Sequence, residues 1–236
     1  MRKIAVATLF LAGLAGPAAA EYSETRELAV DAGGAGLLEL VTGAGSLIVE
    51  GVKGLDAVEV DATIVVDVMR DSKGREMIEK HAVLELDRKG DTIRLVAEFD
   101  NGVWTWGSNG RIDVVVRAPA SLELSVDDGS GSLRVGSFDA NVKIEDGSGS
   151  IVVDSVGALD LDDGSGSIKV RNAAGDVYIN DGSGSITIDT VDGTVTIDDG
   201  SGGIDVSDVS EDLVIVDDGS GGVSFSDVRG KVKQEG

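Results

Sequence analysis

The acidic residues with the clearest potential to bind a ligand recur at one position in the second half of the chain. The string Asp-Gly-Ser-Gly starts at Asp128, Asp146, Asp163, Asp181, Asp199 and Asp218. If these copies stack, the six carboxylates form a column with a spacing of about 4.8 Å. Calcium prefers oxygen ligands of this kind and takes about six to eight of them. The sequence therefore raises the hypothesis of a calcium-binding column along one exposed edge.

A structural role for the same aspartates is the favoured alternative. An Asp that precedes a glycine turn can accept a backbone N–H through its own side chain. The calcium-binding β-roll repeat places Asp inside the glycine turn, whereas Ser or Ile occupies the comparable place here. Like charges at this spacing repel by about 1 kcal/mol per neighbouring pair in water, which an exposed edge tolerates. We expect solvated turn caps, with calcium as the second hypothesis.

Two tryptophans and one histidine are the remaining candidates for chemistry. Trp104 and Trp106 lie in a loop rich in Gly and Asn, where they can stack on a sugar ring or close an open end of the fold. Closure is favoured, and sugar binding makes a carbohydrate-binding or polysaccharide-active protein the alternative function. His81 is the only histidine, and its charged neighbours favour a solvated or capping role. No catalytic triad can be nominated, so we predict that the protein is not an enzyme.

The repeat itself predicts the fold. Successive Asp-Gly-Ser-Gly copies are 18, 17, 18, 18 and 19 residues apart. In each copy the apolar residues alternate with mostly polar ones over two short segments, as in Ile168/Val170 and Val177/Ile179. Two strands per unit and a near-constant period predict coils wound one above another. We predict an all-β protein, a single-stranded parallel β-helix of about 18 residues per coil, with right-handed winding preferred.

Composition and the N-terminal segment indicate the cellular compartment and exclude some classes of binding partner. The 236 residues carry a net charge of -23 and no cysteine, which excludes disulfides and makes nucleic acid a poor partner. Residues 1–20 have two positive charges, an apolar run and a small-residue exit, as in a secretory signal peptide. No later segment is long and apolar enough to span a bilayer. We predict a periplasmic or secreted protein that is not membrane-spanning after signal removal.

The segment between the signal and the array is less regular. Residues 42–49 look like an isolated early copy of the repeat in which Thr42 replaces Asp. Strand patterns follow at Ala57–Val68 and Ile112–Arg117, a hairpin is predicted to turn at Lys89-Gly90, and Ser72–His81 is the one plausible helix. We divide the chain into residues 1–20, a β-rich segment at 21–120 that caps or starts the coil, and the regular repeats at 121–236.

The repeated corners also carry a family resemblance. The GSGSI and DGSGS corners, with the run VVVRAPASLELSVDDGSGSLRV that leads into them, resemble those of the bacterial putative-adhesin family of exported β-helices. The chain is similar, more distantly, to the head domain of autotransporter adhesins, and the resemblance covers roughly Glu27 to the C-terminus. It implies an exported, non-enzymatic structural or adhesive β-helix. The implied partner is a cell-surface or envelope component, with glycans among the candidates.

Overall fold

Each repeat folds into one coil of two short strands. In the coil formed by β12 (Gly166–Ala173) and β13 (Val177–Asp181), buried and accessible side chains alternate as the sequence pattern predicts. The computed structural model describes residues 7–9, 21–68, 71–100 and 110–235. The predicted signal peptide, apart from β1 (Ala7–Leu9), lies outside the described residues, and so does the loop with Trp104 and Trp106.

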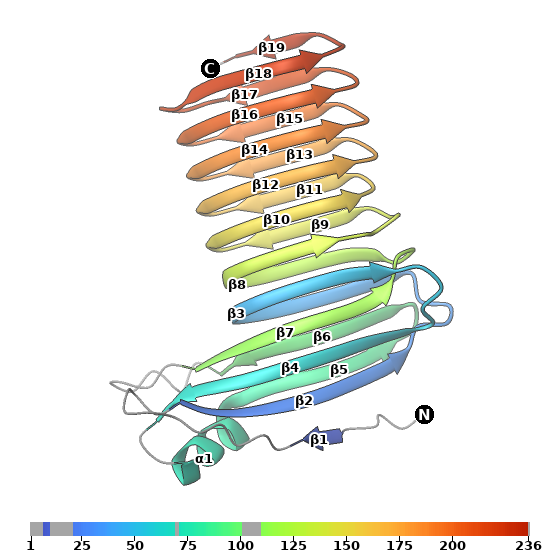
Figure 1. The fold of residues 1–236 in the computed structure, drawn as a ribbon, viewed down its shortest axis with the longest axis vertical. Coiled ribbons are helices and arrows are strands. Elements are labelled where there is room, and N and C mark those ends of the chain that lie inside the picture. Colours follow the sequence, from blue (N-terminus) through green and yellow to red (C-terminus); the bar gives the residue numbers. More distant parts are fainter. Residues whose placement is uncertain (1–6, 10–20, 69–70, 101–109, 236) are drawn as a thin grey trace.

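The coils stack in parallel and in register, so that two long sheets face each other (Figure 1). Ile168 pairs with Ile151 on one side and Ile186 on the other. The first sheet of the array contains the second half of β8 (Glu123–Gly136), whose first half belongs to the second sheet, and β10 (Gly149–Val156), β12, β14 (Gly184–Val191), β16 (Gly202–Val209) and β18 (Gly222–Val228). The second contains β9 (Val142–Asp146), β11 (Leu159–Asp163), β13, β15 (Val195–Asp199), β17 (Leu213–Asp217) and β19 (Val232–Gln234). The predicted parallel β-helix is confirmed, while its handedness stays a prediction.

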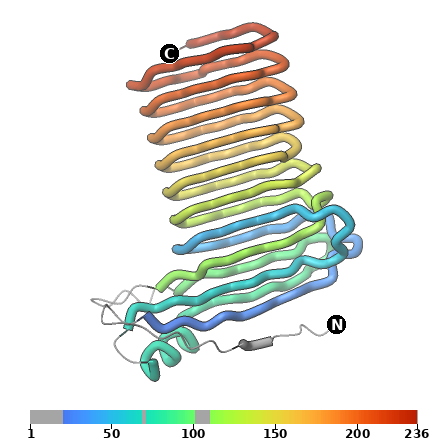
Figure 2. Tube along the Cα trace, in the orientation of Figure 1, coloured from blue at the N-terminus to red at the C-terminus, as the bar shows by residue number. Residues whose placement is uncertain are grey.

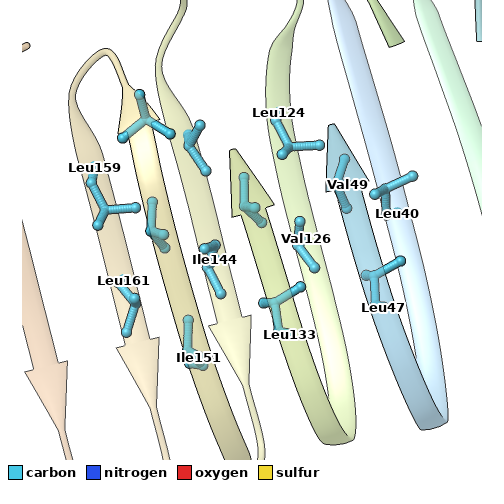
Figure 3. Close-up of a cluster of buried hydrophobic side chains, with 14 of the residues drawn as sticks. Leu40, Leu47, Val49, Leu124, Val126, Leu133, Ile144, Ile151, Leu159 and Leu161 are labelled. Carbon is cyan, nitrogen blue, oxygen red and sulfur yellow. The ribbon is translucent and has the colours of Figure 1, made fainter. Parts of the chain in front are cut away.

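The core fills the space between the two sheets. Figure 3 shows side chains such as Leu133 and Ile151 from the first sheet beside Ile144 and Leu161 from the second. These aliphatic residues belong to one continuous buried cluster that runs from the N-terminal strands to the last coils. Burying an aliphatic side chain of this size contributes about 1.5–3 kcal/mol. The stacked interior therefore supplies most of the stability of a chain with few aromatic residues.

The early copy of the repeat is a coil of the same stack. Strand β3 (Leu37–Val52) pairs with β8 along both of its halves, and Thr42 stands opposite Asp128. Beyond β3 lie β6 (Thr92–Phe99) and β7 (Gly110–Pro119), which continue the two sheets in parallel. The tube in Figure 2 shows this first part of the stack passing directly into the regular coils. Sequence reasoning identified the copy correctly.

Antiparallel strands and the helix cover the N-terminal end. Strands β2 (Glu21–Asp31) and β4 (Ala57–Asp67) pair in antiparallel fashion beyond β7, and β5 (Ala82–Lys89) does so beyond β6. Helix α1 (Asp71–His81) packs its buried Ile78 against this end (Figure 1). The predicted hairpin and helix are therefore present, the helix starting one residue earlier. None of the helices in the described ranges is long and apolar enough to cross a membrane.

The corner that joins the second strand of one coil to the first strand of the next coil requires glycine. In five of the six copies the third position after Asp has a positive φ, which is 155° at Gly184. A Cβ on Gly184 would overlap the carbonyl oxygen of Gly166 in the coil below. The close approach of neighbouring coils therefore explains why this position is glycine in every copy.

A second turn in each coil uses the left-handed region without glycine. The residues with positive φ there are Ser137, Ser155, Asn172, Thr190, Asp208 and Asp227. The same φ, between 54° and 64°, repeats from coil to coil. Residues other than Gly, Asn and Asp adopt this region at a cost, so the turns at Ser137, Ser155 and Thr190 hold some local strain that the packed stack sustains.

Candidate functional site

The repeated aspartates lie inside the coil and not on an exposed edge. Asp163, Asp181 and Asp199 have exposed fractions of 1%, 1% and 0%, and Asp128 and Asp146 are also buried. The expectation of solvated carboxylates is therefore wrong for these five of the six, whereas Asp218 is half-buried. The cause is strand parity: in Val177, Ile179 and Asp181 the same face continues inward to the end of the strand.

The five buried residues stand directly above one another, as predicted for a stacked repeat. Backbone pairing joins Asp128 to Asp146, Asp146 to Asp163, Asp163 to Asp181, and Asp181 to Asp199. Asp128, Asp146, Asp163, Asp181 and Asp199 are called the Asp column below. Parallel pairing places successive members about 4.8 Å apart along the stack.

Three members cap their turns with one oxygen, and all five members have a second oxygen without a partner in the described residues. The backbone N–H of Ser183 donates to Asp181 Oδ1 at 3.0 Å, and those of Ser165 and Ser201 donate to Asp163 and Asp199 at 3.1 Å. The predicted capping role is thus confirmed for these residues. Buried oxygens with no hydrogen-bond partner in the described residues are Oδ2 of Asp128, Asp163, Asp181 and Asp199 and Oδ1 of Asp146.

The two ends of the Asp column differ. At the N-terminal end the Thr42 hydroxyl donates to Asp128 Oδ1 at 2.6 Å. At the C-terminal end the pairing of β15 with β17 shifts by one residue, so that Asp198 stands opposite Asp217. This shift accompanies the longest repeat spacing, 19 residues, and moves Asp218 out of the interior. Outside the column, Asp218 Oδ2 accepts a hydrogen bond from Gln234 Nε2 at 3.1 Å. The column therefore ends at Asp199.

Burial and mutual repulsion raise the pKa values of the column. Burial, and then the charges of Asp128 and Asp163, raise the pKa of Asp146 to about 6. Burial, with added repulsion from Asp163 and Asp199, likewise raises the pKa of Asp181 to about 6. Two full charges about 4.8 Å apart repel by on the order of 3 kcal/mol at the effective dielectric of a protein. A fully ionised column would therefore oppose the stacking that creates it.

The Asp column is a poor match to a calcium site. The described residues contain no group of three or more Asp, Glu or His side chains placed to hold a metal ion. Each buried carboxylate offers one free oxygen, and aliphatic side chains such as Ile168 and Ile186 occupy the rest of the interior. Calcium requires about six to eight oxygens. Calcium binding at the six aspartates stays a prediction, and the experiments below test it.

A shallow groove runs along the outer face of the second sheet. It has a volume of about 620 Å³ and crosses the coils from β8 to β15. Its accessible side chains form two adjacent rows, one with Glu123, Asn141, Ala158, Asp176 and Thr194 and one with Ser125, Lys143, Asp160, Tyr178 and Thr196. These residues are called the lateral groove below. The second row is in register over four coil spacings, a length of about 19 Å.

The chemistry of the lateral groove centres on an exposed aromatic ring. Tyr178 is 45% exposed and stands between Asp160 and Thr196 on the neighbouring coils. Lys143 Nζ lies 2.6 Å from Glu145 Oε1 and next to Asp160 in the register. Within the described residues, no hydrogen bond engages the Tyr178 hydroxyl or the Asp160 carboxylate. The groove thus offers a flat ring flanked by groups that can donate and accept.

His81, another sequence candidate, is not part of either site. His81 Nδ1 lies 2.7 Å from Asp100 Oδ1 near the end of α1, away from the array. Trp104 and Trp106 lie outside the described residues, so their sugar-binding role stays a prediction. Sequence reasoning did not single out Tyr178. Its position between the inward-facing Val177 and Ile179 indicates a side chain that points outward.

Comparisons with known proteins yield structural neighbours alone. No protein-family model and no curated protein matches the chain. A solved structure from Bacteroides fragilis described as a "putative adhesin" is 13% identical, with 92% of this chain and 99% of that chain covered at a TM-score of 0.48. A "putative cell adhesion protein" from Clostridium sporogenes is 14% identical, with 90% and 100% covered at 0.40. A "putative lipid binding protein" from Parabacteroides distasonis is 13% identical, with 90% and 94% covered at 0.35. The chain is thus similar to bacterial structures that mostly carry adhesin names.

Proposed function

We propose that the protein is an exported, non-enzymatic adhesive β-helix that binds a cell-surface or envelope component along the lateral groove. The single observation that carries the proposal is the exposed Tyr178 ring at the centre of a groove about 620 Å³ in volume. The stacked coils hold the side chains of the lateral groove at a fixed spacing. An extended partner can therefore make several weak contacts at once. Periplasmic or secreted localisation belongs to the same proposal.

A glycan is the partner that suits this groove best. The apolar face of a sugar ring can stack on Tyr178, while hydroxyl groups of the sugar meet Asp160, Thr196 and Lys143. A few polar groups around an apolar contact are the usual means by which a binding site orients its ligand. The length of about 19 Å favours an extended chain over a single sugar.

The charge of the whole molecule limits the glycans that can approach. With a net charge of -23 the protein repels polyanions, so that the association rate with acidic polymers falls at low salt. Neutral or amino-sugar polymers are therefore the expected ligands. The same repulsion argues against nucleic acid as a partner.

A glycan array with single-residue variants tests the proposal. The purified protein is applied together with Tyr178→Ala and with Phe225→Ala, a control that removes an equally exposed ring on the last coil outside the groove. Binding that is lost in Tyr178→Ala and kept in Phe225→Ala supports the groove. Binding that is lost only in Trp104→Ala would move the site to the loop and contradict the groove. An array without any bound glycan would count against a glycan partner.

A further inference from the structure

The Asp column combines features that one bound species can reconcile. Its five carboxylates are buried and stacked in register, and each keeps one oxygen that no other described residue contacts through a hydrogen bond. An unpaired buried carboxylate is costly, and a row of them adds repulsion to that cost. A ligand for the column must therefore be small enough to fit between coils about 4.8 Å apart and must reduce the negative charge.

No basic group among the residues that the structure describes neutralises the column. The ion pairs of the described residues involve other carboxylates, such as Glu145, Glu59 and Asp139. The charged groups nearest the column are themselves acidic, namely Asp127, Asp162, Asp198, Asp217 and Asp218. The opposite sheet presents the aliphatic side chains of Leu133, Val135, Ile151, Val153, Ile168, Val170, Ile186, Ile188, Ile204 and Val206. Among the described residues, Thr42, at one end, is the only neutral hydrogen-bond donor that reaches a member through its side chain.

We propose that the Asp column is a proton-binding site, in which protonated aspartic acids alternate with carboxylates and each acid donates its O–H to a free oxygen of a neighbouring coil. A hydrogen bond of this kind has an O···O distance of about 2.5–2.7 Å. Side chains that lean toward each other from backbones about 4.8 Å apart can reach this distance. The protons come from solvent, and folding takes them up.

The order of the members favours this alternation. Asp146 and Asp181, the second and fourth of the five, have pKa values raised to about 6 by burial and by the charges on both sides. With these two protonated, every neighbouring pair contains one acid and one carboxylate. The first and last members, Asp128 and Asp199, then remain charged next to the Thr42 hydroxyl and the exposed end of the array.

The proposal gives the stability of the fold a definite pH dependence. The pKa of both residues is near 6 in the folded chain and 3.8 without the fold, so folding binds protons between these values. Stability from this source is fully present below pH 3.8 and is lost as the pH rises through about 6. At pH 5 the two groups together make the unfolding constant about a hundredfold smaller than at pH 8. A protein held by ionised carboxylates would show the opposite trend.

Two measurements test the proposal on the intact protein. The first follows the carboxyl carbons of labelled Asp by NMR as the pH changes. The expected result is a subset of Asp carboxyls with midpoints near 6. Midpoints near 4 for all of them would overturn the proposal. This arm needs no variant, so it decides even if substitutions in the column impair folding.

The second measurement compares urea unfolding at pH 5 and pH 8 for Asp181→Asn and for its control Asp162→Asn. Asp162 lies on the strand that pairs with β13, is also an aspartate and points outward. The ratio of unfolding constants between the two pH values should fall about tenfold in Asp181→Asn and stay at the wild-type value in Asp162→Asn. Asp181→Thr, which copies the natural Thr42, should behave like Asp181→Asn. An unchanged ratio in both column variants would refute proton binding.

A third measurement tests whether the column binds calcium in place of protons. A melting temperature at pH 8 that stays constant between EDTA and millimolar calcium supports the proton. If calcium raises the melting temperature of the wild type and not of Asp181→Asn, the column binds metal and the proposal is wrong. None of these outcomes depends on the lateral groove, so a failure here is distinct from a failure of the adhesive function.

Discussion

The glycine at the inner corner of each coil gives the most quantitative prediction. Gly184→Ala places a Cβ against the Gly166 carbonyl and imposes a φ of 155° on an alanine. The backbone strain costs about 1–3 kcal/mol. Moving the coil to relieve the overlap also weakens the hydrogen bond from Gly184 N to Ser201 O, 2.9 Å long, which adds about 1 kcal/mol. We expect a loss of about 3 kcal/mol in the free energy of unfolding.

Urea denaturation followed by circular dichroism measures this loss. With a slope of about 2 kcal/mol per molar urea, the midpoint should fall by about 1.5 M. Gly203→Ala is the matched control, because a Cβ there meets nothing within 4 Å and the position pairs with Ser185 in the neighbouring coil. Its midpoint should stay close to the wild-type value. Equal losses in the two variants would refute the argument from close approach of the coils.

Three further predictions concern the core, the strained turn and the last coil. Ile168→Ala leaves a cavity between the sheets, so it should lower the free energy of unfolding in urea by about 2–5 kcal/mol. The control Lys169→Ala should change this free energy by less than about 0.5 kcal/mol. Similar losses in the two variants would contradict the inward position of Ile168. Thr190→Asn should raise the free energy of unfolding in urea by about 0.5–1 kcal/mol, because Asn tolerates a φ of 64° better than Thr. A decrease in this free energy would show that the turn is unstrained. Deletion of residues 229–236 removes β19 from β17 and should produce oligomers in size-exclusion chromatography, which a monomeric profile at high concentration would exclude.

Local periodicity made most of the fold predictable. The spacing of Asp-Gly-Ser-Gly and the alternation within each unit predicted two strands per coil, and Thr42 was identified as an early copy that the structure places opposite Asp128. The N-terminal hairpin and helix followed from turn residues and charge pattern. The antiparallel pairing of β2 with β4 was not predictable, because it joins segments that have no shared motif and meet only through the stack.

The candidate site was predictable in part. The column of aspartates was expected, but its burial was missed because the acidic character of Asp outweighed the strand parity that Val177 and Ile179 display. Parity alone would have placed Asp181 inward. The lateral groove could not be derived, since it depends on small residues such as Ala158 lying beside Tyr178 across separate coils. That juxtaposition appears only once the register is known.

In-register stacking of consecutive repeats underlies both the Asp column and the lateral groove, and engineered disulfides test it most directly. The chain has no cysteine, so pairs can be introduced without competing thiols. Lys169 and Thr187 are register partners on neighbouring coils, whose Cα atoms are expected about 4.8 Å apart, within the range that a disulfide spans. Lys169 and Asp205 are two coils apart, at about twice that distance. Under mild oxidation the Lys169→Cys/Thr187→Cys variant should cross-link and the Lys169→Cys/Asp205→Cys variant should not. Equal cross-linking of both pairs, or of neither, would contradict the stack and with it the Asp column and the lateral groove.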